Sequence, residues 1–346
     1  MDISELLSFT VKHNASDLHL SSGQVPMVRI DGEMNRINAQ PLSESELRAL
    51  INSVMTDVQR SLFEEKLELD FSFQLPDVAR FRVNVFHTSR GSAAVFRHIP
   101  HQIQTLDELG CPKVFIDAIQ SINGLVLVTG PTGSGKSTTL AAMVDYISEN
   151  SNKHIVTIED PIEFVHTSKK SLINQREVNR DTLSFSTALR SALREDPDVI
   201  MVGELRDLET IRMALTAAET GHLVLATLHT NSAAKTIDRI IGVFPSNEKD
   251  MIRSMLSESL RAVISQTLVK RMDAEGRIAA YEILVATSAV RNLVREEKIA
   301  QIYSVMQTGF EQGMHTMDQS LLRLVEKNII SREAARARAL HKDMFN

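Results

Sequence analysis

Residues 125–144 read LVLVTGPTGSGKSTTLAAMV: an apolar run, a glycine-rich turn and a helix-prone segment follow one another. The turn matches the phosphate-binding P-loop pattern G-x-x-x-x-G-K-[ST] at every fixed position, and it stands between a strand and a helix, as that pattern requires. Glycines leave backbone N–H groups free to approach phosphate oxygens, and the helix N-terminus adds partial positive charge. We therefore expect a nucleotide-binding loop rather than a tight glycine turn with a surface lysine.

The predicted phosphate-binding turn consists of Gly130, Pro131, Thr132, Gly133, Ser134, Gly135, Lys136, Ser137 and Thr138. In this pattern the lysine reaches the terminal phosphates, and the hydroxyl of Ser137 ligates Mg²⁺. The sequence thus predicts a bound nucleotide, ATP or GTP, together with Mg²⁺.

The composition limits the class of protein. The chain has 346 residues, a formal net charge of −6 and one cysteine, Cys111. The negative charge gives no general attraction to nucleic acid, and one cysteine allows neither an internal disulfide nor a four-cysteine zinc site. The N-terminus is acidic where a secretory signal is basic, and no apolar run approaches the ~18 residues of a membrane span. We expect a cytoplasmic protein with no transmembrane segment.

The first part of the chain, residues 1–100, mixes short helices with alternating strands and predicts a small α+β domain. Ser43 and Glu46 form a capping box that opens a helix, and Asp31-Gly32 is typical of a hairpin turn. A strand is also predicted where Phe81, Val83 and Val85 alternate with Arg82, Asn84 and Phe86, and we expect it to be buried on both faces.

A linker is predicted over residues 101–111, because Pro100 directly before it and Gly110 within it interrupt the regular patterns. From residue 112 to 346, short apolar runs alternate with helical patterns, which predicts a mostly parallel α/β sheet. Besides the P-loop strand, the predicted strands are 154–158, 199–202 and 223–227. The chain is expected to be mostly helical from about residue 232 onward.

Acidic side chains follow two of these strands, at the sheet edge where open α/β sheets bind ligands. Glu159 and Glu163 come after the first and are candidates for the general base. We favour Glu163 because Glu159 directly abuts the strand, but both remain open, as does a solvated acidic turn. Glu204 ends the second strand after Gly203, where many P-loop enzymes carry a metal-linked aspartate, so Glu204 is our candidate for the metal shell.

Histidines and arginines complete the candidate site. His229 follows a third strand and is a candidate for contact with the γ-phosphate or the attacking water, whereas His222 is more simply explained as structural. Phosphoryl transfer also benefits from a cation near the leaving phosphates. The arginine candidates are Arg80, Arg82, Arg97, Arg190, Arg194, Arg206 and Arg212. A surface salt bridge is the alternative for each of them.

In combination, these motifs resemble one family, the RecA-like ATPases of secretion systems and pili. The segments that carry the resemblance are 130–138 (Walker A), 157–164 (the acidic Asp box), 198–204 (Walker B) and 220–231 (the His box). Residues 289–296 read AVRNLVRE and are similar to the A-I-R-N-L-I-R-E signature of the pilus retraction branch. The short N-terminal domain and the lack of a four-cysteine zinc module also fit that branch, and the resemblance covers nearly the whole chain.

The resemblance implies a hexameric, Mg²⁺-dependent ATPase that powers type IV pilus retraction and twitching motility. It implies a PAS-like N-terminal domain, a RecA-like domain with a helical C-terminal region, and ATP bound between them. Arg80, Arg82 and Arg97 would then approach the phosphates, within one subunit or across subunits, with Arg194 as a further catalytic candidate.

The implied partners are an inner-membrane platform protein of the pilus and an accessory paralogous ATPase, which places the protein at the cytoplasmic face of that membrane. A pilus-assembly or secretion ATPase and an accessory retraction ATPase are the alternatives within the family. A RecA-like nucleic-acid motor is the alternative from another class, and the acidic balance of the chain counts against it.

Overall fold

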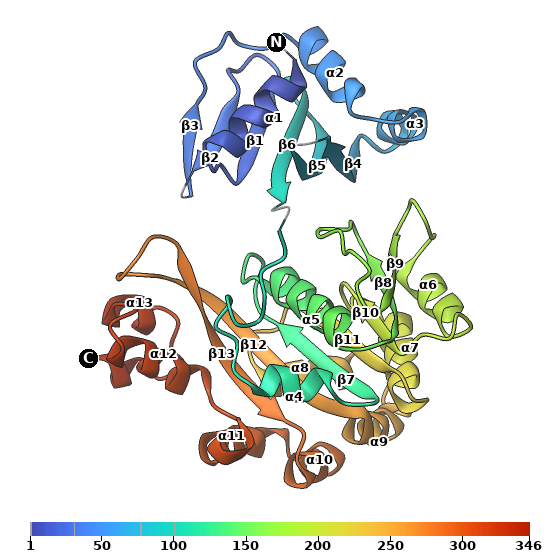
Figure 1. Ribbon diagram of the computed structural model, residues 1–346, viewed down its shortest axis with the longest axis vertical. Coiled ribbons are helices and arrows are strands. Elements are labelled where there is room, and N and C mark those ends of the chain that lie inside the picture. Colours follow the sequence, from blue (N-terminus) through green and yellow to red (C-terminus); the bar gives the residue numbers. More distant parts are fainter. Residues whose placement is uncertain (1, 31, 77, 100–101) are drawn as a thin grey trace. The chain divides into compact units, whose positions relative to one another are not determined.

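The computed structural model describes residues 2–30, 32–76, 78–99 and 102–346. The chain forms two compact units (Figure 1). The N-terminal unit comprises the residues up to Gln102 together with Pro161–Val165, and the P-loop unit comprises Ile103–Asp160 and His166–Asn346. Asp31 of the predicted hairpin turn, and Pro100 and His101 at the start of the predicted linker, lie outside the described residues.

The N-terminal unit is an antiparallel sheet with helices on one face. The helices are α1 (Ile3–Lys12), α2 (Glu44–Ser53) and α3 (Asp57–Lys66). The strands are β1 (Asp17–Ser21), β2 (Met27–Ile30), β3 (Glu33–Arg36), β4 (Glu68–Leu75), β5 (Ala79–Thr88) and β6 (Gly91–Ile99), in the spatial order β3-β2-β1-β6-β5-β4. The predicted capping box is confirmed, because Ser43 and Glu46 exchange backbone-to-side-chain hydrogen bonds at the start of α2.

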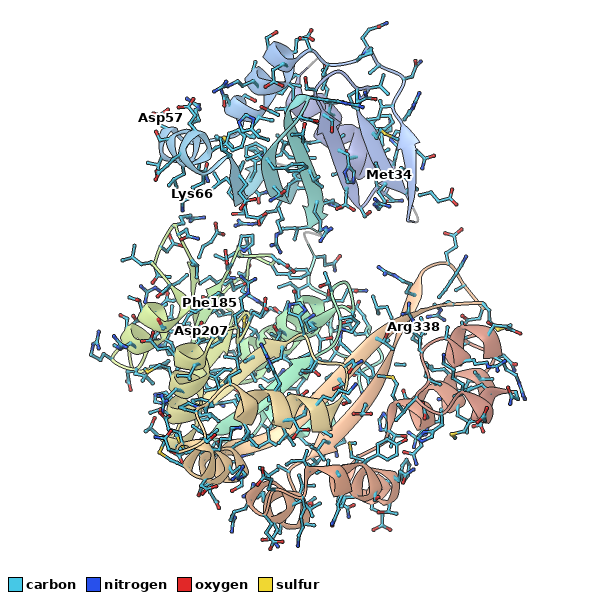
Figure 2. All side chains as sticks on the ribbon, turned by 180° about the vertical axis from the view of Figure 1, so that it is seen from behind. Met34, Asp57, Lys66, Phe185, Asp207 and Arg338 are labelled. Atoms are coloured by element: carbon cyan, nitrogen blue, oxygen red, sulfur yellow. The ribbon has the colours of Figure 1, made fainter. Side chains whose placement is uncertain are left out.

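The two faces of this sheet differ in polarity. On β5, Phe81 and Val83 are buried in the core with α1–α3, whereas Arg80 and Arg82, which alternate with them, are only half-buried. The expectation that this strand is buried on both faces is therefore wrong, because alternate side chains of a strand point to opposite faces and one face here is charged. The edge strand β3 is exposed along its length, as Met34 in Figure 2 illustrates.

The P-loop unit is built on a seven-stranded sheet. Its strands are β7 (Gly124–Thr129), β8 (His154–Glu159), β9 (Leu172–Glu177), β10 (Val199–Val202), β11 (Leu223–Leu228), β12 (Leu260–Lys270) and β13 (Arg277–Val285), in the order β13-β12-β7-β11-β10-β8-β9. Neighbouring strands are parallel except for β12 and β13, which are antiparallel. The prediction of a mostly parallel sheet is confirmed.

Helices cover both faces of this sheet, as can be followed in Figure 1. One face packs against α4 (Val114–Ile119) and α5 (Lys136–Asn150), and the other against α6 (Phe185–Ala192), α7 (Leu208–Glu219), α8 (Ala233–Gly242) and α9 (Lys249–Ser259). On β7, Val126 and Val128 pack into the core with α4 and α5, whereas Leu125 and Leu127 pack into the core with α6–α9. Burial on both faces is why these strands read as continuous apolar runs rather than as alternating patterns.

The C-terminal part is mostly helical, as predicted, but it also contains β12 and β13, drawn in orange in Figure 1. These two strands were not anticipated. The remaining helices are α10 (Ser288–Arg295), α11 (Ile302–Thr308), α12 (Met317–Glu326) and α13 (Arg332–Arg336), with 3₁₀ turns η1 (Ile299–Gln301), η2 (Phe310–Gln312) and η3 (Lys342–Phe345). Among the described residues, no helix combines the length and the hydropathy that a membrane span needs.

Candidate nucleotide-binding and catalytic site

The P-loop connects the end of β7 to the start of α5. Gly130, Gly133 and Gly135 all have positive φ, of 147°, 76° and 90°, a backbone region that side chains other than glycine rarely adopt. A Cβ on Gly130 would lie 2.3 Å from the carbonyl oxygen of Gln266 on β12. The glycine at this position is therefore required by close approach of two backbones as well as by its φ.

The loop offers groups that suit a phosphate and a hard cation. The Oγ hydroxyl of Ser134 is buried and has no hydrogen-bond partner within the part of the chain that the structure describes. Ser137 lies in the first turn of α5, where backbone N–H groups have no intrahelical acceptor. Oxygen donors are what Mg²⁺ prefers, and it is usually held by one or two side chains together with substrate phosphates. The residues present thus fit both groups.

Lys136 is buried, and its ammonium lies across the loop. The Nζ atom donates to the carbonyl oxygens of Gly130 at 2.9 Å and Pro131 at 3.0 Å. It also lies 3.4 Å from Nδ1 of His229, on the loop after β11. These contacts hold the lysine at the P-loop, where phosphate oxygens can take the place of the carbonyls.

Glu204 and His229 extend this contact to the ends of two further strands. Nε2 of His229 is 3.2 Å from Oε1 of Glu204, which follows β10. The carboxylate accepts and Lys136 donates, so the network assigns the imidazole proton to Nε2 and leaves Nδ1 as the acceptor. Arg206 holds the other carboxylate oxygen of Glu204 at 2.9 Å and lies 3.6 Å from Asp160. Parallel topology thus gathers residues from distant segments at one sheet edge.

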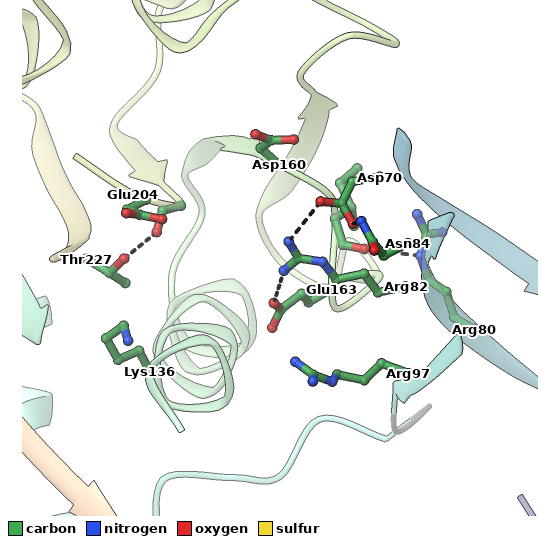
Figure 3. A network of polar contacts seen from close by, with 12 residues as sticks. Asp70, Arg80, Arg82, Asn84, Arg97, Lys136, Asp160, Glu163, Glu204 and Thr227 are labelled. Carbon is green, nitrogen blue, oxygen red and sulfur yellow. Dashed lines mark hydrogen bonds and ion pairs between the residues drawn. The ribbon is translucent and has the colours of Figure 1, made fainter. Parts of the chain in front are cut away.

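Gly203 occupies the position after β10 at which many P-loop enzymes carry an aspartate. A Cβ there would come within 3.3 Å of the Ile158 carbonyl oxygen and 3.4 Å of the Glu159 Cα. The Thr227 hydroxyl on β11 donates to the carbonyl oxygen of Gly203, as the dashed line in Figure 3 shows. The backbone before Glu204 is therefore packed between β8 and β11, and the first carboxylate after β10 is that of Glu204.

Glu159 is buried at the end of β8. Its Oε1 accepts from the Thr157 hydroxyl at 2.7 Å and from Nε2 of Gln175 at 3.0 Å. Oε1 of Gln175 in turn accepts from the backbone N–H of His166 at 2.7 Å. Burial lowers the pKa of His166 to about 4, so this histidine is neutral near pH 7. Glu159 is thus engaged in the local structure that follows the strand.

Glu163 belongs to the N-terminal unit. Its Oε1 lies 3.5 Å from Nη1 of Arg82, whose Nη2 is 3.9 Å from Asp70, and Figure 3 shows Arg82 between the two carboxylates. Arg80 donates to the carbonyl oxygen of Ile162 at 3.2 Å. Arg97 pairs with Asp17 at 2.9 Å. These three arginines share one face of the N-terminal sheet, as their register requires.

The remaining arginine candidates lie elsewhere in the P-loop unit. Arg190 pairs with Glu209 on α7, and Arg212 pairs with Glu248. Arg194 is exposed after α6, and among the described residues it forms no ion pair. It precedes β10, so it lies toward the amino ends of the strands, and the chain does not bring it to Lys136.

His222 lies before β11, also at the amino edge of the sheet, and its Nδ1 is 3.0 Å from the carbonyl oxygen of Ala217. The structural explanation of this histidine therefore agrees with its contacts.

Gln266 was missed by the sequence analysis. Its side chain is buried on β12, donates from Nε2 to the carbonyl oxygen of Ser134 at 2.7 Å, and accepts at Oε1 from the Thr139 hydroxyl at 2.9 Å. It therefore links the P-loop to α5. A lone glutamine within an apolar run, LRAVISQTLVK, was the available signal, but it became informative only with the knowledge that β12 lies beside β7.

The signature segment forms α10. Val290 and Val294 are buried, whereas Arg295 pairs with Glu258 at 2.9 Å and Arg291 donates to the carbonyl oxygen of Ala286 at 3.0 Å. Its apolar side is therefore part of the core of the P-loop unit, and its charged side carries local pairs.

The geometry and the motifs agree with a known family. Residues 1–336 match the family described as Type II/IV secretion system protein. The chain belongs to this family. The family and the RecA-like fold class predicted from the motifs are thereby confirmed.

Individual relatives within the type II/IV secretion family are close. The type IV pilus retractation ATPase PilT of Pseudomonas aeruginosa is 64% identical over 345 residues, covering 100% of both chains. A twitching motility protein of Neisseria gonorrhoeae is 63% identical over 321 residues, covering 93% of this chain and 86% of that protein. A crystal structure of the pilus retraction motor PilT with bound ADP matches with a TM-score of 0.91 at 46% identity, covering 99% of this chain and 98% of that one.

Proposed function

We propose that this chain is the ATP-hydrolysing motor of type IV pilus retraction and twitching motility. The observation that carries the proposal is the contact series from Lys136 through His229 to Glu204, with distances of 3.4 Å and 3.2 Å. It joins the phosphate-binding lysine to a carboxylate and a polar side chain at two other strand ends, which is what phosphoryl transfer to water requires. The full-length similarity to a pilus retraction ATPase supports the specific biological role.

In the proposed reaction, Lys136 and the loop amides bind the β- and γ-phosphates of ATP. Water attacks the γ-phosphorus in line, the bond to the ADP oxygen breaks, and the water gives its proton to a carboxylate base. Ser137 and Glu204 would hold Mg²⁺, which neutralises phosphate charge when bound. His229 keeps Glu204 and Lys136 in register, and the ammonium of Lys136 meets the developing charge on the γ-phosphoryl oxygens.

We assign the base role to Glu163 rather than Glu159. Glu159 is buried and already accepts from Thr157 and Gln175, which supports a positioning role. Glu163 is partly exposed, with 35% of its side chain accessible, so its carboxylate can meet a water. The alanine variant of the true base should bind nucleotide and lose turnover, whereas loss of binding together with turnover would indicate a structural carboxylate.

The proposed assembly is a homo-hexamer that acts on an inner-membrane platform protein of the pilus at the cytoplasmic face. An accessory paralogous ATPase is a further proposed partner. Arg80, Arg82 and Arg97 are proposed to serve the nucleotide site in the same subunit or from a neighbour, and Arg194, which is exposed, only from a neighbour. Sequence similarity to retraction motors supports these proposals.

The experiment that tests the function combines turnover with retraction. Lys136→Ala should abolish phosphate release and, in a deletion strain, fail to restore twitching and pilus retraction. Lys113→Ala, which removes an exposed lysine before α4, is the matched control and should behave like the unaltered chain. Normal phosphate release from Lys136→Ala would contradict the proposal, and so would turnover that rises on addition of single-stranded DNA but leaves retraction unrestored.

A further inference from the structure

Glu282 on β13 is a buried carboxylate that the proposed reaction does not use. Only 4% of the residue is accessible to solvent. Its side chain shares a face of the sheet with Leu284, which packs into the core with α6–α9. Burying a charge in an apolar core is costly unless the charge is paired or hydrogen-bonded. The groups that Glu282 contacts therefore indicate what this carboxylate does.

The carboxylate of Glu282 holds the start of α8. Its Oε1 accepts from the backbone N–H of Ala233, the first residue of that helix, at 2.8 Å. An N–H in the first turn of a helix has no acceptor within the helix, so a side chain has to supply one. Burial raises the pKa of Glu282, whereas the backbone N–H groups of Ala233 and of Met317, at the start of α12, lower it. One carboxylate thus serves the first turns of two helices, where negative charge is favoured.

The start of α8 is joined to the loop that carries His229. The hydroxyls of Thr230 in the loop and Thr236 on α8 are 2.7 Å apart, and the Thr236 hydroxyl donates to the carbonyl oxygen of Ser232 at 2.7 Å. Because the Thr236 proton is used in that bond, Thr230 is the donor to Thr236. The loop is therefore tied to the first turn of α8, and that turn is tied to Glu282.

We propose that Glu282 is a positioning residue for His229: it fixes the start of α8 and so determines where the loop presents the imidazole between Lys136 and Glu204. This inference rests on the proposed ATPase function, in which His229 keeps those two groups in register. A displacement of about 1 Å at a reacting site can cost about 10²-fold in rate. ADP carries no γ-phosphate and is bound mainly by the loop amides. Loss of Glu282 should therefore affect turnover more than ADP binding.

The first part of the test separates turnover from binding in the full chain. Glu282→Met keeps a similar side-chain volume and removes both acceptor oxygens. We expect it to lower kcat by about 10- to 10²-fold and to change the ADP dissociation constant by less than about 3-fold. Glu282→Gln keeps one acceptor oxygen for Ala233 and should recover most of the rate.

The second part asks whether Glu282 acts through His229. In a His229→Ala background, Glu282→Met should cause no further loss of kcat, because residues that act as a unit are not additive. Hydrogen exchange of the peptide 229–236 gives a measure that does not depend on turnover. We expect exchange of this peptide to be faster in Glu282→Met than in the unaltered chain, because the N–H of Ala233 has lost its acceptor.

Asp318→Leu is the matched control, since it also removes a buried carboxylate that accepts from backbone N–H groups. Asp318 lies in the first turn of α12 and accepts from the N–H groups of Leu340 at 2.8 Å and His341 at 3.0 Å, so it joins α12 to the C-terminal segment. Its loss should lower the urea midpoint. It should leave kcat and the exchange of the peptide 229–236 unchanged.

Several outcomes would overturn the inference. Unchanged kcat in Glu282→Met would refute it, and so would losses that multiply in the double variant or an equal loss of kcat in Asp318→Leu. A rise in the ADP dissociation constant as large as the loss of kcat would show that the P-loop itself had collapsed, which also contradicts a role through His229.

Failure of this inference can be told from failure of the proposed function. Unchanged exchange of the peptide 229–236 in Glu282→Met refutes the positioning role, and the ATPase function still stands if the unaltered chain turns over and Lys136→Ala does not. If the unaltered chain shows no turnover, the proposed function fails, and the role of Glu282 in catalysis fails with it.

Discussion

Gln266 provides the sharpest test of how the P-loop is held. Its carboxamide makes two buried hydrogen bonds, to the Ser134 carbonyl oxygen at 2.7 Å and from the Thr139 hydroxyl at 2.9 Å. Gln266→Met keeps the side-chain volume but removes both bonds, so the cavity cost is small. Each buried group left without a partner costs about 1–3 kcal/mol. We expect the free energy of unfolding to fall by about 2–6 kcal/mol.

The Gln266→Met substitution should also weaken the binding of ADP. Without Gln266, the carbonyl of Ser134 is free to turn, and part of the binding free energy must be used to restore the loop. If about 1–2 kcal/mol is needed, the ADP dissociation constant should rise by about 5- to 30-fold. Urea unfolding gives the stability, and titration of ADP at a temperature where the variant is folded gives the affinity.

Ser265→Ala is the matched control for this prediction. Ser265 neighbours Gln266 on β12 and its hydroxyl pairs with that of Thr129 at 2.7 Å, also in a buried position. Its loss should destabilise the fold by about 1–2 kcal/mol and leave ADP affinity unchanged, because the two hydroxyls bond to each other and, among the described residues, neither bonds to a P-loop carbonyl. If Gln266→Met weakens ADP binding no more than Ser265→Ala, the argument that Gln266 shapes the phosphate site is refuted.

Two predictions concern titration. Burial raises the pKa of Cys111 to about 11, and its sulfur lies 3.5 Å from the Tyr281 hydroxyl. Iodoacetamide should therefore label the folded chain slowly at about pH 8 and rapidly once urea unfolds it. Rapid labelling of the folded chain would contradict the burial of this thiol. Burial lowers the pKa of His315 from 6.5 to about 4, so the unfolded state binds more protons between these values and the free energy of unfolding should fall as the pH is lowered through them. His315→Asn should make the urea midpoint less dependent on pH between about pH 7 and pH 5, and an unchanged slope would exclude His315 as a contributor.

Much of the P-loop unit could be predicted because its strands are buried on both faces and its turns have fixed chemistry. A polar side chain follows within two residues of the apolar run before Gly130 and of the runs that became β8, β10 and β11, so the edge of the sheet that carries the candidate site could be recognised. The strands β12 and β13 were missed because LRAVISQTLVK directly follows α9 and has no turn signal at the boundary. An apolar run without punctuation does not separate a strand from a continuing helix.

Some residues of the candidate site could be predicted from the sequence, whereas the contacts of others could not. Lys136, Ser137 and Glu204 could be assigned because a short motif specifies both the residue and its local conformation. The contacts of His229 and the partners of Glu163 could not be assigned, since each depends on residues from another segment. Lys136 and His229 are 93 positions apart, and Arg80 and Ile162 are 82 apart.

Local pattern therefore specified the glycine turn, the parallel strands and the lysine that lies at that turn, because these depend on neighbours within a few residues. Chain packing alone settled that Gln266 supports the turn, that His229 lies between Lys136 and Glu204, and that Glu163 is held by Arg82. The physical reason is that strand register and the path of the chain between units place distant residues in contact. No spacing along the sequence encodes such contacts.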